Sequence, residues 1–144
     1  MTAAPRVVDA VPLSGATAAD AARIARADVE LRGLEQAGPS FELRVFLGNA
    51  DADADTAPAE DDGYAGSIHV YGYGTVLPPD LAESEARPRL PMTRSLIATD
   101  AVRRAARAGP TASVTLVPVG YEGSGDGIDL GPVQVAILVD EGLA

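Results

Sequence analysis

Six carboxylates within twelve residues form a group of potential metal ligands. They are Asp51, Asp53, Asp55, Glu60, Asp61 and Asp62. Calcium loops bind their ion with oxygen donors at alternate positions and a carboxylate at position twelve. Here Thr56 stands at position six, where such loops have glycine, and Asp62 replaces the final glutamate. The spacing therefore allows a calcium site built from Asp51, Asp53, Asp55 and Asp62, but these departures favour a solvated loop that charge repulsion keeps extended.

The chain has one histidine, His69, and no cysteine. His69 and Ser67 would share one face of a strand, because they are two residues apart. A serine nucleophile needs an activating base and usually a GxSxG turn, and the sequence contains no such motif. A single imidazole without a second histidine is also a weak indication of a metal site. We therefore expect a structural or surface histidine, and we expect no catalysis by this chain alone. An enzyme that pairs His69 with a carboxylate is an alternative hypothesis.

Two of the four tyrosines, Tyr71 and Tyr73, alternate with glycine in the segment YGYG. Tyrosine combines a large apolar ring with a polar tip and is therefore enriched where proteins bind one another. The alternative is that these rings cover the edge of a sheet. On their chemistry, Tyr71 and Tyr73, together with the neighbouring His69, are the predicted partner-binding residues.

Two alternating runs, residues 41–47 and 65–73, would position these side chains. In the first run every second residue is apolar, which is the pattern of a strand with one buried side, and Phe46 is the one apolar residue out of step. In the second run two apolar residues lie on the side opposite His69. We expect these runs to pair as antiparallel strands joined by a long acidic loop over residues 49–63.

Residues 18–36 allow two interpretations. An alanine-rich segment, which Thr17 and Asp20 could cap, favours one or two helical turns. From Arg26 onward apolar and charged residues alternate, which favours a strand over residues 26–32. A single helix through 18–36 is the alternative.

The clearest helical pattern covers residues 100–108. Thr99 or Asp100 would cap its start, and a left-handed Gly109 followed by a proline would end it. Alanine and valine form a narrow apolar stripe on this helix, while its arginines are expected to face solvent. These arginines are Arg103, Arg104 and Arg107.

The remaining elements are short strands separated by turns rich in glycine and proline. The other expected strands are residues 7–13, 92–98, 114–119 and 133–139. Residues 1–5 are expected to be disordered, and residues 49–63 and 78–91 are expected to be long loops. The pattern predicts a mostly β fold: one domain over residues 1–144, an antiparallel β-sandwich or small barrel of about six or seven strands with one short helix.

Composition limits the possible partners. The chain has 144 residues and a net charge of −10, and all eleven of its basic residues are arginine. Nucleic acids and anionic membranes attract positive surfaces, so both are excluded as expected partners. No run approaches the roughly 20 apolar residues of a membrane span. The N-terminus lacks the pattern of a secretory signal, so we expect a cytoplasmic protein.

Three blocks carry a resemblance to a known family. They are FELRVFLGNADADADT (residues 41–56), YAGSIHVYGYG (residues 64–74) and SVTLVPVGYEGSGDGIDLGPVQVAIL (residues 113–138). In this order they resemble the C-terminal β-domain of type 3 copper proteins, the group of tyrosinase, polyphenol oxidase and molluscan haemocyanin. The third block is similar to the last hairpin of that domain. The resemblance covers about two-thirds of the chain, and residues 1–40 match only loosely.

The resemblance implies a function without catalysis. Enzymes of this family hold two coppers with six histidines on a helical domain, whereas this chain has one histidine. The chain would be the non-catalytic β-part, an accessory subunit or domain that binds a type 3 copper oxidase-like partner and shields or stabilises it. It would hold no cofactor itself, because copper would lie in the partner. The alternative is a stand-alone protein-binding or calcium-responsive β-sandwich module.

Overall fold

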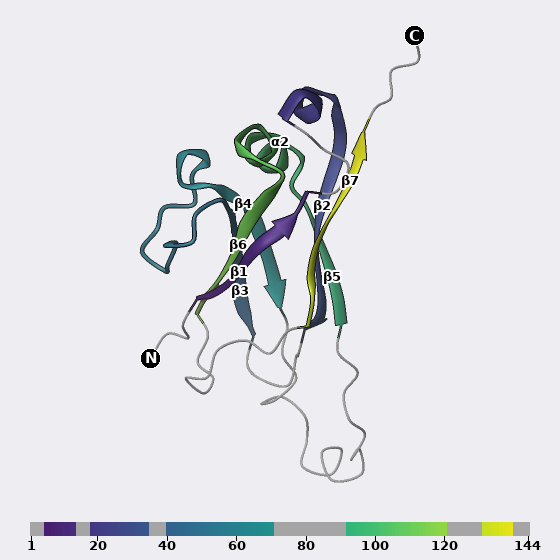
Figure 1. The fold of residues 1–144 in the computed structure, drawn as a ribbon. Coiled ribbons are helices and arrows are strands. Elements are labelled where there is room, and N and C mark those ends of the chain that lie inside the picture. Colours follow the sequence, from purple (N-terminus) through teal and green to yellow (C-terminus); the bar gives the residue numbers. More distant parts are fainter. Residues whose placement is uncertain (1–4, 14–17, 35–39, 71–91, 121–130, 140–144) are drawn as a thin grey trace, which may run out of the picture.

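The computed structural model describes residues 5–13, 18–34, 40–70, 92–120 and 131–139 (Figure 1). Within them lie seven β-strands, one α-helix and two short 3-10 helices, labelled η. In chain order these are β1 (Arg6–Pro12), η1 (Ala18–Arg23), β2 (Ile24–Leu34), β3 (Phe41–Leu47), η2 (Glu60–Asp62), β4 (Tyr64–Val70), β5 (Met92–Ile97), α2 (Thr99–Ala108), β6 (Thr111–Val119) and β7 (Val133–Val139). The expected loop at 78–91 lies outside the described residues.

The strands form two antiparallel sheets. Sheet A has the order β1-β6-β3-β4, and sheet B has the order β5-β2-β7. Figure 1 shows them as two layers, with α2 at one end. The predicted mostly β sandwich with one short helix is confirmed, and the described strands do not close into a single barrel. The expected pairing of residues 41–47 with the second alternating run is also confirmed, because β3 pairs with β4.

The core lies between the inward faces of the two sheets. Strand β2 contributes Ala27, Val29 and Leu31, while Leu43 and Val45 of β3 face them from sheet A, all fully buried. Burial of one Val, Leu or Ile side chain contributes about 1.5–3 kcal/mol. The alternate apolar residues seen in the sequence are therefore the ones whose burial stabilises the packing of the two sheets.

Residues 18–34 contain both a helical segment and a strand. The 3-10 helix η1 ends at Arg23, and β2 begins at Ile24 and pairs with both β5 and β7. The single helix considered for 18–36 is therefore wrong. A strand forms because alternate residues from Ala27 to Leu31 bury apolar side chains against the opposite sheet.

Strands β6 and β7 do not form the hairpin that the family resemblance implied. Strand β6 lies in sheet A between β1 and β3, whereas β7 pairs with β2 in sheet B. The reason is burial on both sides of β6, where Val114, Thr115, Leu116 and Val117 are all covered. A strand covered on both faces suits the middle of a sheet, and its two hydrogen-bonding edges are already occupied.

The ends of α2 also differ from expectation. Ala98 precedes the helix and no side chain caps it, because the Thr99 hydroxyl instead accepts a hydrogen bond of 3.2 Å from the Ala27 amide. Gly109 has a φ of 165°, which is extended and not left-handed. The chain continues directly into β6, and the Pro110 carbonyl accepts a 2.9 Å hydrogen bond from the Leu13 amide.

The edge strands of the two sheets contact each other, β4 with β5 and β1 with β7. Gly66 allows the close approach of β4 to β5. Its φ is 140°, and a Cβ atom at this position would lie 2.9 Å from Cδ1 of Leu96. Within the described part of the chain, no helix has the length and apolar character needed to cross a bilayer.

Candidate functional site

The acidic loop, residues 49–63, has a folded conformation and is not extended. The Asn49 side chain accepts a hydrogen bond from the Asp51 amide (3.2 Å) and donates one to the Asp62 carbonyl (2.9 Å). The Asp53 carboxylate accepts a hydrogen bond of 2.9 Å from the Asp55 amide. Such side-chain-to-backbone bonds stabilise tight turns. The loop ends in η2, which Gly63 terminates in the left-handed conformation, with a φ of 84°.

The acidic loop packs on the outer face of sheet A. Ala52 is 3% exposed and forms a small second core with Phe46 and Val117. The Tyr64 ring meets Phe46 edge to face, with 5.6 Å between ring centroids. Phe46, the apolar residue out of step in its strand, therefore points outward because the loop covers it.

The proposed calcium ligands lie apart. Asp51, Asp53 and Asp55 are exposed, while Asp62 is half-buried in η2. Among the described residues, no three His, Cys, Asp or Glu side chains form a group that could hold a metal. The oxygen Oδ1 of Asp53 is already bonded within its own turn. Calcium binding by this loop stays a prediction.

A polar network crosses β3 and β4 on the same outer face. The hydroxyls of Tyr64 and Ser67 are 2.6 Å apart, and Ser67 donates a hydrogen bond of 2.9 Å to Oε1 of Glu42. The same oxygen accepts a hydrogen bond of 3.3 Å from Nε of Arg44. Since Ser67 has one proton and gives it to the carboxylate, Tyr64 must donate to Ser67.

The network lowers the pKa of Glu42 below its usual value of 4.5. The hydrogen bond from Ser67 is the largest cause, and the hydrogen bond and positive charge of Arg44 add to it, while partial burial acts in the opposite direction. Hydrogen bonds to the charged form hold this carboxylate ionised. The Glu42 carboxylate is therefore held on the outer face of sheet A as the anionic partner of Arg44.

His69 lies where the sequence predicted, exposed on the polar side of β4. It pairs across the strands with Glu42, and its charge makes a small contribution to the low pKa of that carboxyl group. Ser67, on the same face, gives its proton to Glu42. In this arrangement the carboxylate holds the serine hydroxyl, so the geometry does not form a Ser–His nucleophile. The other predicted contact residues, Tyr71 and Tyr73, lie outside the described residues.

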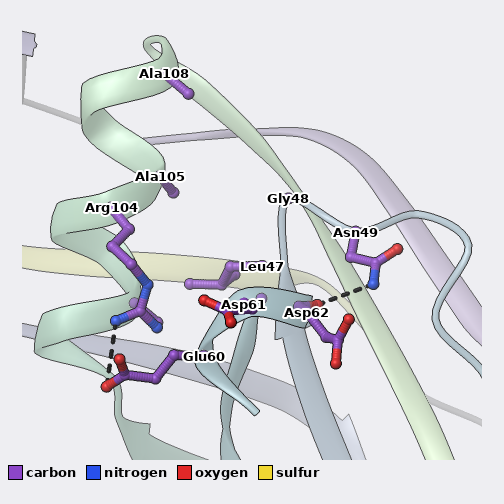
Figure 2. A pocket seen from close by; sticks show the side chains of 11 residues that line it. Leu47, Gly48, Asn49, Glu60, Asp61, Asp62, Arg104, Ala105 and Ala108 are labelled. Carbon is purple, nitrogen blue, oxygen red and sulfur yellow. Dashed lines mark hydrogen bonds and ion pairs between the residues drawn. The ribbon is translucent and has the colours of Figure 1, made fainter. Parts of the chain in front are cut away.

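A cleft of about 350 Å³ separates α2 from the acidic loop. Figure 2 shows Ala105 and Ala108 of the helix on one side and η2 on the other, with the Arg104 side chain between them. The Arg104 guanidinium lies 3.7 Å from Oε1 of Glu60 and 3.5 Å from the Tyr64 carbonyl. A second hollow of about 430 Å³ adjoins it on the side of Tyr64 and Ile97.

Sequence reasoning missed this cleft because it placed the arginines of α2 in solvent. Arg103 instead donates hydrogen bonds of 3.0 and 2.6 Å to the Ile24 carbonyl, which ties the helix to the start of β2. Arg104 turns toward the acidic loop. The available signal was charge: a cluster of acidic residues followed, far along the chain, by a helix rich in arginine.

Comparison of the sequence with protein families and with curated proteins found no match. Among solved structures, however, the fold has clear counterparts. They include chains of latent aurone synthase, a polyphenol oxidase.

The likeness to aurone synthase covers nearly the whole chain. For the enzyme from its natural source, the TM-score is 0.60 at 14% identity over 94% of this chain. For the recombinant latent enzyme, the TM-score is 0.58 at 15% identity over the same share. This chain spans only about a quarter of those chains, 25% and 24%. The fold therefore resembles one part of these polyphenol oxidase chains.

Proposed function

We propose that this protein is a non-catalytic accessory subunit or domain that binds a type 3 copper oxidase-like partner and shields or stabilises its copper site. The likeness of 94% of the chain to one quarter of a latent polyphenol oxidase supports this proposal most directly. The histidine count also supports it, because one imidazole cannot supply the nitrogen ligands of a dinuclear copper site.

The proposed function is exerted through contact. Copper belongs to the partner, and this chain contributes surface. His69 is exposed near the end of β4, at the edge of sheet A, and Tyr71 and Tyr73 follow it directly in the sequence. These three residues are the proposed contacts. Aromatic rings at such a site would exclude water and substrate from the partner's copper.

The test uses the purified chain and a type 3 copper oxidase from which its own β-domain has been removed. We expect a complex at micromolar concentration and slower oxidation of a diphenol as the chain is added. The double substitution Tyr71→Ala with Tyr73→Ala should weaken both effects by about tenfold or more, because aromatic anchors dominate interfaces. The control is Tyr71→Phe with Tyr73→Phe, which keeps the rings.

The readout is binding by calorimetry together with the rate of diphenol oxidation. Absence of a complex at micromolar concentration, with copper-loaded oxidase, would remove the basis of the proposal. If the alanine variant forms the complex equally well, the accessory function is supported, but Tyr71 and Tyr73 are not its contacts.

A further inference from the structure

Two large apolar side chains are exposed on the outer face of sheet B. Leu138 of β7 is 63% exposed and Ile97 of β5 is 62% exposed. Both alternate with inward neighbours, so they point away from the core. Exposed apolar residues that share one face indicate an interaction surface more strongly than isolated ones.

An ion pair lies between these two residues on the central strand. Arg26 is opposite Leu138 in the pairing of β2 with β7, and Asp28 is opposite Ile97 in the pairing of β2 with β5. Two bonds join Arg26 to Asp28, Nε to Oδ1 at 3.0 Å and Nη2 to Oδ2 at 3.2 Å. We call Arg26, Asp28, Ile97 and Leu138, with the exposed Ala136 opposite Asp28, the sheet B patch.

Charge favours contact at this patch in spite of the acidic chain. Its one positive and one negative side chain cancel, and Glu30 and Arg32 further along β2 form a second such pair at 3.4 Å. The acidic loop packs on the outer face of sheet A, in the opposite layer, and of its six carboxylates only Glu60 lines the same hollow as Ile97. Figure 1 shows that loop on the far side of the sandwich from β7. Another protein that approaches sheet B along β2 and β7 thus avoids most of the acidic loop.

The charge pattern of the patch is complementary to itself. A two-fold axis that lies in the plane of the contact and crosses β2 at right angles, between Arg26 and Asp28, places each Arg26 over the Asp28 of the other copy. The same operation places Leu138 over the other copy's Ala136, because these residues flank Arg26 and Asp28 on β7. Isologous contacts of this type are the commonest basis of homodimers.

We propose that two copies of this chain associate face to face through the sheet B patch. The dimer buries Leu138 and Ala136 at the centre of each copy's contact, with Ile97 at its rim. Arg26 and Asp28 form ion pairs between the copies. This proposal is independent of the accessory function, since it concerns the purified chain alone and a different surface.

Sedimentation velocity on the purified chain at micromolar to submillimolar concentration tests the proposal. We expect a reversible dimer, and we expect Leu138→Glu to raise its Kd by at least about tenfold, because the substitution replaces an apolar side chain at the contact with a charged group that must be desolvated. The matched control is Val7→Glu. Val7 is also exposed, at 40%, but lies on β1 of sheet A. The control variant should dimerise as the native chain does.

Charge reversal gives a second, sharper test that does not depend on apolar burial. Arg26→Asp alone would place two carboxylates over each other, and Asp28→Arg alone would place two guanidinium groups together, so each variant should be monomeric. An equimolar mixture of the two should form a heterodimer, because every contact between copies is then of opposite sign. Circular dichroism confirms that each variant is folded.

Two results would overturn the proposal. One is a native chain that sediments as a monomer throughout this concentration range. The other is a native dimer that Leu138→Glu leaves intact and that shows no recovery in the mixture of charge-reversed chains. In either case the accessory function would be untouched.

Discussion

At the scale of single residues, the polar network on sheet A shows how neighbours set the behaviour of a side chain. Glu42 and Ser67 are unremarkable in the sequence, where Ser67 drew interest only as a companion of His69. In the structure Ser67 instead donates to Glu42, and Tyr64 supports it from the other side. The pairing of Ser67 with Glu42 could not be predicted from the neighbouring sequence, because the register between the two strands determines it.

The low pKa of Glu42 predicts a pH-dependent contribution to stability. Its folded-state pKa is lowered, so the carboxylate stabilises the fold above the unfolded value, and this contribution is lost as the pH falls through the folded value. Ser67→Ala removes the largest cause of the shift. We expect it to lower the free energy of unfolding by about 1 kcal/mol at neutral pH.

Urea unfolding at pH 7 and at an acidic pH below the folded-state pKa of Glu42 measures this effect. The difference between Ser67→Ala and the native chain should shrink at the acidic pH, where Glu42 becomes protonated. In a Glu42→Gln background, the serine substitution should lose its pH dependence. A difference that stays constant with pH would show that the hydroxyl acts only through packing.

At the scale of elements, the acidic loop is a folded layer and not a solvated connection. Its like charges point outward, while Ala52 and Phe46 hold it on sheet A. The sequence contained a sign of this arrangement, because Phe46 broke the alternation of its strand. An apolar residue on the polar side of a strand requires a cover, and the loop provides it.

A substitution at Ala52, the buried contact of the acidic loop, should release the loop from sheet A. Ala52→Glu introduces a charge where the side chain is 3% exposed, and we expect it to cost roughly 2 kcal/mol. Hydrogen exchange at the Asp55 amide, which bonds to Asp53, should accelerate. Ala54→Glu is the control, because Ala54 is exposed in the same loop. Equal exchange in both variants would contradict the packing of the loop on the sheet.

A measurement of calcium binding distinguishes the accessory function from a calcium-responsive module. The carboxylates of Asp51, Asp53 and Asp55 do not converge, so calorimetric titration of the purified chain with calcium chloride should give no heat beyond dilution. Heat that Asp53→Ala abolishes would instead establish a metal site in the loop and favour the stand-alone module. The control is the same titration with Asp100→Ala, which changes an exposed carboxylate on α2.

At the scale of the whole molecule, periodicity predicted the layers but not their connections. Strands β2 and β3 could be predicted because alternate residues along them are buried. Which strands pair depends on contacts between distant segments, and neighbouring β6 and β7 were wrongly joined for that reason. The cleft beside Arg104 was missed on the same ground, since it forms between a helix and a loop about 40 residues apart.

The contacts of β4 with β5 and of β1 with β7 have a consequence for recognition. Sheets with open margins bind one another through their backbones, which is indifferent to sequence and leads to fibrils. Here each edge strand lies against an edge strand of the opposite layer, and at Gly66 an added Cβ atom would lie 2.9 Å from Cδ1 of Leu96. We therefore expect side chains, and not the backbone of an edge strand, to determine which partner binds. Single substitutions can then change this preference.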